Sequence, residues 1–158
     1  MNLSHLTRRF LAHGSAKTLT ENERNSVAIR LADRALAELF FAQPVSDQRH
    51  GYDAGEWLAG RSVPPWMVQA GMLHDVGKRH APMGRWRRAV ATTLGWLRIV
   101  PPGAMSLYNA HGSTGADELA AVHADARVVV YTAHHHGHRP AELTVNEWEM
   151  LDEADRKN

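Results

Sequence analysis

Apolar residues recur at three- and four-residue spacing along nearly the whole chain, which is the period of an amphipathic helix. The clearest apolar stripe runs from Val27 to Leu39, and it follows Thr20 and Glu23, which have the spacing of a capping box. The pattern therefore predicts one continuous helix that starts after Thr20 and ends near Gln43.

Proline, glycine and capping residues divide the rest of the chain into further predicted helices, with Ser46 as the cap of one of them. These helices are expected over Leu3–His13, Ser46–Gly60, Pro65–His74, Gly84–Val100, Ala116–Val122, Asp125–His136 and Thr144–Ala154. The β-branched run Val128–Tyr131 is the one alternative strand, but no other segment offers it a partner. The predicted fold is all-α, a single compact helical bundle with short connections.

Composition agrees with one globular domain. The chain has 158 residues, of which 44% are apolar and 22% charged, values typical of a protein with a real core. The formal net charge of +1 argues against a dedicated nucleic-acid binder, whose surface would be strongly basic. Five tryptophans are enough to cover a dimer patch, so a homodimer is one expectation.

Two further counts narrow the chemistry. The absence of cysteine excludes disulfides, iron–sulfur clusters and thiolate zinc sites, so any metal must be held by nitrogen and oxygen. No apolar run approaches the roughly 18 residues of a membrane span, and the expected location is the cytoplasm. The eleven histidines are unusually many for this length, and histidine is the side chain most often recruited to bind metals.

The strongest local motif is His74-Asp75-Val76-Gly77-Lys78, at the end of a predicted apolar helix. His74 and Asp75 offer an imidazole nitrogen and a carboxylate side by side, and the two carboxylate oxygens can each take a different metal ion. Gly77 allows a sharp backbone turn, and Lys78 places a positive charge where a substrate phosphate could meet it. A plain helix end with a glycine stop is the competing interpretation of this motif.

Other histidines and an aspartate lie at the ends of other predicted helices. They are His50, His111, the run His134-His135-His136, and Asp155 near the end of the chain. Side chains from several helices of a bundle can converge on one interior point, and a metal ion satisfies buried histidines and aspartates together.

This ordered set resembles the HD superfamily of metal-dependent phosphohydrolases, over about Ser46 to Arg156. The resemblance implies an HD-type metal-binding domain at residues 44–158 and an N-terminal helical extension at residues 1–43. It also implies one or two divalent ions, drawn from Mn, Fe, Co, Ni, Zn or Mg. By position, His50, His74, Asp75 and Asp155 match the residues that hold the first metal in this family.

His111 and one or two histidines of the triple run match the further ligands of the two-metal members. His135 is the first choice and His134 the second, while His136 stays open. The chain reads Gly137-His138-Arg139-Pro140 where the HD-GYP phosphodiesterases carry Gly-Tyr-Pro. It therefore resembles more closely the small bacterial members that include the diadenosine tetraphosphatases.

The resemblance implies a phosphohydrolase that acts on a nucleotide or a related small phosphate. A divalent ion lowers the pKa of bound water from 15.7 towards about 7, which supplies hydroxide at neutral pH. Asp75 is expected to bridge two ions, and Lys78, with Arg79 or Arg139, to offset charge on the phosphoryl oxygens. If a single ion binds, His111 is the candidate general acid or a hydrogen-bond donor to the phosphate.

Two alternatives to hydrolysis stay open at this point, and so does the role of one basic segment. The chain could be a catalytically silent module that senses a nucleotide, or a histidine-rich bundle whose metal only stabilises the fold. The basic segment Arg85–Arg88, which contains Trp86, could cover the pocket and contact a nucleotide, or it could be an ordinary solvated helix face. With the apolar residues from Trp96 to Val100 nearby, it could also be part of an amphipathic segment at a membrane surface.

Overall fold

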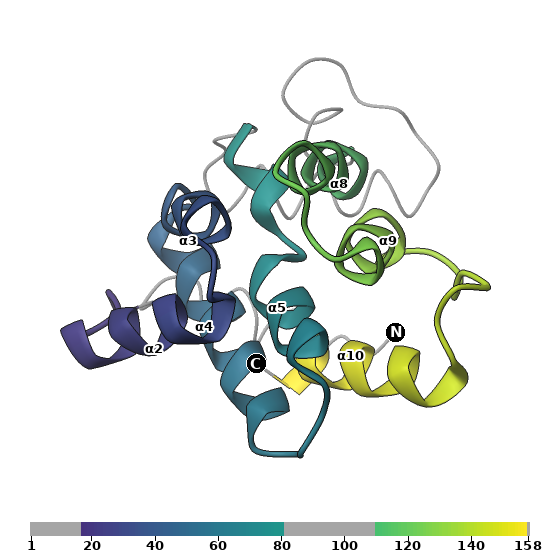
Figure 1. Cartoon of the computed structure of the whole chain (residues 1–158), viewed down its shortest axis with the longest axis horizontal. Helices are drawn as coiled ribbons and strands as arrows, with labels where there is room; N and C mark the ends of the chain where they lie inside the picture. The colour runs from purple at the N-terminus through teal and green to yellow at the C-terminus, as the bar shows by residue number, and fades with distance from the viewer. Residues whose placement is uncertain (1–16, 81–109, 158) are drawn as a thin grey trace, which may run out of the picture.

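The computed structural model describes residues 17–80 and 110–157, and within these ranges the regular structure is helical, as predicted. The elements are α2 (Glu21–Leu31), α3 (Arg34–Phe41), α4 (Val45–Ala59), α5 (Pro65–Leu73), the short 3₁₀ helix η1 (Val76–His80), α8 (His111–Ala121), α9 (Ala126–His134) and α10 (Val145–Lys157). In Figure 1, α5 lies near the centre, with α2, α3 and α4 to one side of it and α8 and α9 to the other. The expected helices Leu3–His13 and Gly84–Val100, and the Arg85–Arg88 segment, lie outside the described residues.

The expected continuous helix from Thr20 to Gln43 is wrong, because the chain forms two helices there. Thr20 and Glu23 form the predicted capping box at the start of α2. However, Ala32 adopts a left-handed conformation, and the Asp33 carboxylate accepts hydrogen bonds from the backbone N–H groups of Ala35 and Leu36. Asp33 thus caps a second helix, and this local capping interrupts the apolar stripe that the period alone would continue.

The Val128–Tyr131 run lies within α9, so the helix prediction is confirmed there and the strand alternative is wrong. Asp125 caps α9 through its side chain, which accepts a hydrogen bond from the backbone N–H of Arg127. Ser46 is not a cap, because α4 begins one residue before it, at Val45.

Close packing of α4 on α5 positions the first half of the candidate site. A Cβ atom on Gly51 would lie 2.6 Å from the carbonyl oxygen of Met72, so only glycine permits this approach. The neighbouring His50 is thereby carried to α5, and its ring centroid lies 5.2 Å from that of His74.

Gly77 has a comparable role between η1 and α8. A Cβ atom there would lie 2.7 Å from the backbone nitrogen of Gly115, and closer still to the carbonyl oxygen of His111. Its φ lies outside the left-handed region, so the turn into η1 does not require a backbone conformation that only glycine adopts. Close contact is the reason for glycine here, and this contact brings His111 beside Asp75.

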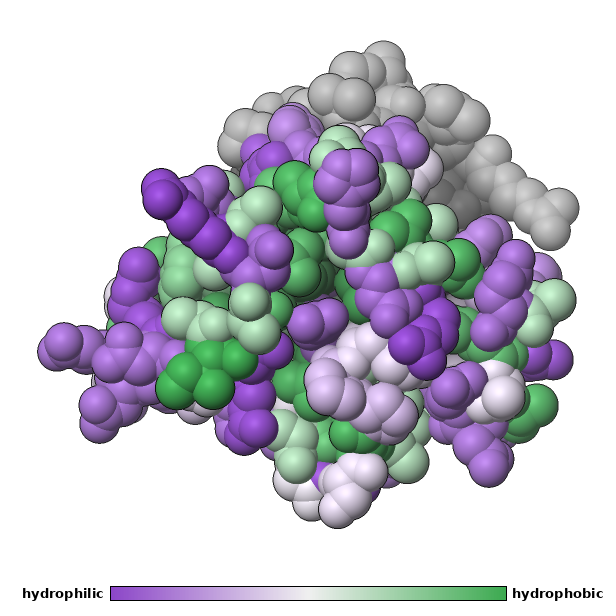
Figure 2. All heavy atoms as spheres, in the orientation of Figure 1, coloured by the Kyte–Doolittle hydropathy of each residue, from purple (hydrophilic) through white to green (hydrophobic). Residues whose placement is uncertain are grey.

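A single apolar core connects these helices. Val27 and Leu31 of α2 belong to it together with Leu58 of α4, Leu119 of α8 and Leu151 of α10. The first two helices thus pack on the same core as the rest, while the predicted boundary after residue 43 stays a prediction. On the face drawn in Figure 2, polar side chains separate the apolar ones into small groups. Across both described ranges, no helix has the length and apolar character needed to cross a membrane.

Candidate metal centre

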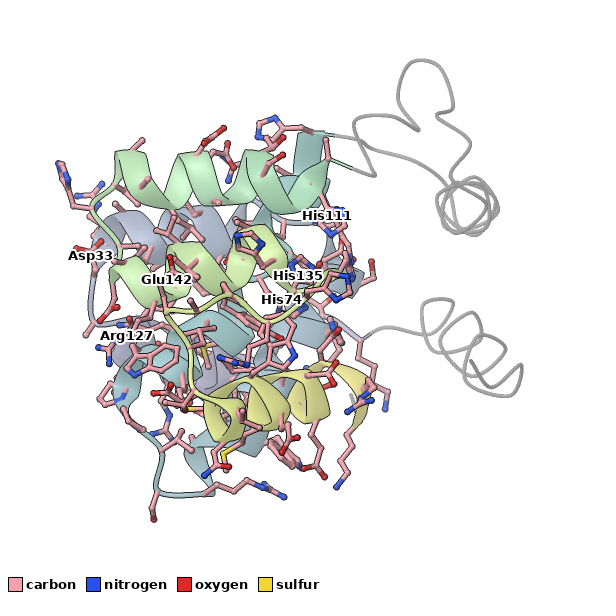
Figure 3. All side chains as sticks on the ribbon, turned by 90° about the vertical axis from the view of Figure 1, so that its right-hand side faces the viewer. Asp33, His74, His111, Arg127, His135 and Glu142 are labelled. Atoms are coloured by element: carbon pink, nitrogen blue, oxygen red, sulfur yellow. The ribbon has the colours of Figure 1, made fainter. Side chains whose placement is uncertain are left out.

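His74 and Asp75 follow directly on the last residue of α5, and both are 1% exposed. His74 still has helical dihedral angles, so its ring stays in line with the helix while the chain turns into η1. Figure 3 shows His74 close to His111 and His135, whereas Asp33 and Arg127 lie at the opposite side of the bundle. Two groups of possible ligands meet at this point, and Asp75 belongs to both.

The first group consists of His50, His74 and Asp75, which offer ligand atoms within 4.8 Å of one another. Asp155 lies beside it. Its Oδ1 is 2.9 Å from His50 Nε2 and 3.5 Å from His74 Nε2. Helices α4, α5 and α10 therefore each supply part of one buried cluster of two imidazoles and two carboxylates.

The second group consists of Asp75, His111, His135 and His136. His111 Nε2 lies 3.3 Å from His135 Nε2 and 3.1 Å from His136 Nε2. The Oδ1 atom of Asp75 is 3.4 Å from His111 Nε2 and 3.5 Å from His135 Nε2. His111 and His135 are buried, whereas His136 lies at the exposed rim. This group therefore contains three imidazoles and one carboxylate.

Asp75 faces the two groups with different oxygens. Its Oδ1 points to His111 and His135, and its Oδ2 lies 3.5 Å from His74 Nε2. A carboxylate placed in this way is suited to bridge two cations.

Backbone carbonyls set the tautomers of two of these histidines. His74 Nδ1 lies 3.0 Å from the Gly71 carbonyl oxygen, and His135 Nδ1 lies 2.8 Å from that of Thr132. Because a carbonyl only accepts hydrogen bonds, each Nδ1 carries the proton and donates it. Each Nε2 then turns a lone pair towards the cluster, which is the usual arrangement of a metal-binding histidine.

Two atoms at the centre of the cluster have no hydrogen-bond partner among the described residues. They are His74 Nε2 and Asp75 Oδ1, and both are buried. Buried polar atoms without partners are costly in a native structure. A divalent cation is one partner that can accept electron pairs from an imidazole nitrogen and a carboxylate oxygen together, so the residues present fit a metal ion.

The charges agree with this fit. Burial by itself raises the pKa of Asp75, but the charges of Lys78 and His74 and the nearby His111 and His135 rings bring it well below its ordinary value. Burial lowers the pKa of His135. Although His136 as a residue is exposed, its ring packs against His135 and His111, and desolvation of the ring together with these imidazoles lowers its pKa to about 2. An ionised carboxylate and neutral imidazoles are the forms that bind cations.

His74 differs from the other histidines. Burial lowers its pKa, but the carboxylates of Asp75 and Asp155 outweigh that effect and raise the pKa above its ordinary value. The two carboxylates therefore favour the protonated, positively charged form of the His74 imidazole.

The structure places the predicted metal ligands as follows. It brings together His50, His74, Asp75, His111, His135 and Asp155, while His134 is exposed and lies outside both groups. His136 joins the second group instead. Metal binding by these residues stays a prediction.

The three predicted phosphate contacts are engaged within the protein. Lys78 is buried and donates a hydrogen bond to Asp75 Oδ2. Arg79 pairs with Glu118 of α8, and Arg139 donates hydrogen bonds to the carbonyl oxygens of Leu143 and Pro140. Arg79 and Arg139 thus stabilise local structure.

Tyr131 was not singled out from the sequence, yet it packs against both groups. Its buried ring has its centroid 6.3 Å from that of His74 and 6.1 Å from that of His135. Tyr131 precedes His135 by four residues, so the two share a helix face. This four-residue spacing is the feature of the sequence that could have identified Tyr131.

Comparison with known proteins gives no relative. No protein-family model, curated protein or solved structure matches this chain.

Proposed function

We propose that this chain is a metal-dependent phosphohydrolase of the HD superfamily, which cleaves a phosphoester or phosphoanhydride bond of a nucleotide or related small phosphate. The observation that carries the proposal is the Asp75 carboxylate, whose two oxygens face two separate buried ligand groups. A pair of adjacent divalent-ion sites is a frequent arrangement in enzymes that hydrolyse phosphate esters.

The donor atoms suit a divalent ion of the borderline class. Imidazole nitrogen together with carboxylate oxygen is compatible with Mn, Fe, Co, Ni or Zn, and Mg remains a candidate at the group with more oxygen ligands. When bound, such an ion polarises a phosphoryl oxygen and lowers the pKa of water.

The protein's own residues have the following proposed roles. Asp75 stays ionised and, as a member of both ligand groups, holds them next to each other. The carbonyl oxygens of Gly71 and Thr132 keep His74 and His135 in the tautomer that directs Nε2 inward. Lys78 is engaged as well, but its partner is Asp75 Oδ2 within the ligand groups themselves, and we assign it the role of balancing negative charge on a phosphate. Arg79 and Arg139 take no part in this proposal, since both side chains are engaged elsewhere.

The test is hydrolysis by protein that has been stripped with a chelator and reloaded with Mn²⁺. Substrates are bis(p-nitrophenyl) phosphate and a panel of nucleotides, dinucleotides and cyclic dinucleotides. Asp75→Ala is expected to abolish turnover while circular dichroism stays helical, and His134→Ala, which alters an exposed histidine outside both groups, is the matched control. Metal binding without hydrolysis of any substrate would instead favour a catalytically silent, nucleotide-sensing module.

A further inference from the structure

The two ligand groups differ in what their atoms already contact. In the first group, His50 Nε2 is 2.9 Å from Asp155 Oδ1, so these two potential ligands are paired with each other. In the second group, His111 Nε2 is within hydrogen-bond distance of two other imidazole nitrogens, at 3.3 Å from His135 Nε2 and 3.1 Å from His136 Nε2. Each group also holds one buried atom without a hydrogen-bond partner among the described residues, His74 Nε2 in the first group and Asp75 Oδ1 in the second.

Lys78 adds a further difference. It lies three residues after Asp75 in η1, and its backbone N–H donates to the Asp75 carbonyl oxygen at 2.9 Å. Its buried ammonium group donates to Asp75 Oδ2, the oxygen nearest to His74 Nε2. The Lys78 ammonium group therefore already occupies Asp75 Oδ2, the carboxylate oxygen that the first group would offer to a metal ion.

We propose that Lys78 competes with the metal ion for Asp75 Oδ2, and that the first group is thereby the weaker and more easily exchanged of two unequal metal sites. This inference rests on the metal centre of the proposed function but not on hydrolysis. Like charges a few ångströms apart repel strongly inside a protein, where screening by water is weak. A cation at the first group requires the ammonium group to move away or to remain as an unfavourable neighbour, whereas a cation at the second group meets Oδ1 directly.

Titration calorimetry with MnCl₂ on the full chain, stripped with a chelator, tests this proposal. We expect the unaltered protein to bind in two steps with dissociation constants at least about tenfold apart. Lys78→Met removes the charge and keeps most of the side-chain length, and it should tighten the weaker step by about tenfold or more while leaving the tighter step unchanged. Lys17→Met removes one charge from an exposed position and is the control.

A second measurement covers the case that Lys78→Met folds poorly, since it leaves Asp75 buried without its cation. Thermal unfolding with and without Mn²⁺ should show a larger rise in Tm for Lys78→Met than for the unaltered protein, because at one Mn²⁺ concentration the stabilisation by a ligand increases as its dissociation constant falls. Lys78→Arg keeps the charge and should retain the weak step.

The outcomes separate this inference from the proposed function. Equal affinities for the two steps, or a Lys78→Met titration identical to that of the unaltered protein, would overturn the competition. Absence of metal binding in every variant would overturn the metal centre and the competition together. Two unequal steps that respond to Lys78→Met support the competition whether or not any substrate is hydrolysed.

Discussion

His50 Nε2 lies 2.9 Å from Asp155 Oδ1, although 105 positions separate the two residues in the sequence. The contact joins α4 to α10 inside the bundle, next to His74. It closes the first ligand group, so a change at Asp155 should act on that group and spare the other.

Asp155→Asn is expected to weaken Mn²⁺ binding at the first group by at least about tenfold, because loss of a ligand or its close neighbour costs 10–100-fold in metal affinity. The second group should bind as before. Asp152→Asn is the control, since Asp152 lies one helical turn earlier and pairs with Arg156 at the surface. Titration calorimetry gives both affinities, and an equal loss at both groups would contradict the assignment of Asp155.

Two adjacent histidines should behave differently. His135→Ala removes a buried ring of the second group and is expected to lower the metal content of the purified protein by about one ion per chain. His134→Ala alters an exposed ring outside both groups and should leave the metal content unchanged. Elemental analysis after dialysis measures the difference. A loss of metal in His134→Ala alone would show that the placement of these two rings is wrong.

Gly77→Ala should destabilise the fold and disturb the second group. The added methyl group meets backbone atoms of His111 and Gly115, which cannot rotate away as a side chain can. We expect a loss of about 3 kcal/mol in the free energy of unfolding, the upper part of the range for overpacking. Urea denaturation measures it.

Gly60→Ala is the control for this change. A Cβ atom there would make only ordinary contacts, at 3.7 Å, and Gly60 has helical dihedral angles. Its free energy of unfolding should stay within about 1 kcal/mol of the original value. A comparable loss of unfolding free energy in Gly77→Ala and Gly60→Ala would mean that the close approach of η1 to α8 does not cause the destabilisation.

Glu23 makes the fold sensitive to acid. The hydrogen bond from Arg49 and that from the Thr20 backbone N–H lower the pKa of Glu23 from 4.5 to about 2. Because the folded-state pKa is the lower one, this stabilisation is complete above pH 4.5 and is lost as the pH falls from 4.5 to about 2. Glu23→Gln should therefore show a weaker pH dependence of unfolding across this window. An identical pH dependence for the two proteins would contradict the role of this carboxylate.

Much of the candidate centre could be predicted from the sequence because its residues stand at the ends of periodic helices. The resemblance supplied the order His50, His74-Asp75, His111 and Asp155, and the structure brings these side chains together. The choice among the three consecutive histidines could not be predicted in this way. It depends on where α9 ends, since each residue of a helix turns the side chain by about 100°.

The contacts of Lys78 and Arg79 could not be predicted from the sequence either. Arg79 meets Glu118 across two helices, and Lys78 meets Asp75 only because η1 is a tight 3₁₀ turn. The break at Asp33 is different, because its signal was present. An aspartate that caps a helix lies within the apolar stripe, and the period of the stripe concealed it.

The central claim is that Asp75 holds two cations, one on each of its carboxylate oxygens. Anomalous diffraction from crystals of the full chain grown with Mn²⁺ tests it most directly. The account predicts two anomalous peaks, one beside Oδ2 among His50, His74 and Asp155, with the lower occupancy, and one beside Oδ1 among His111, His135 and His136. Well-diffracting crystals in saturating Mn²⁺ with a peak at only one oxygen of Asp75, or at neither, would contradict the assignment of two cations.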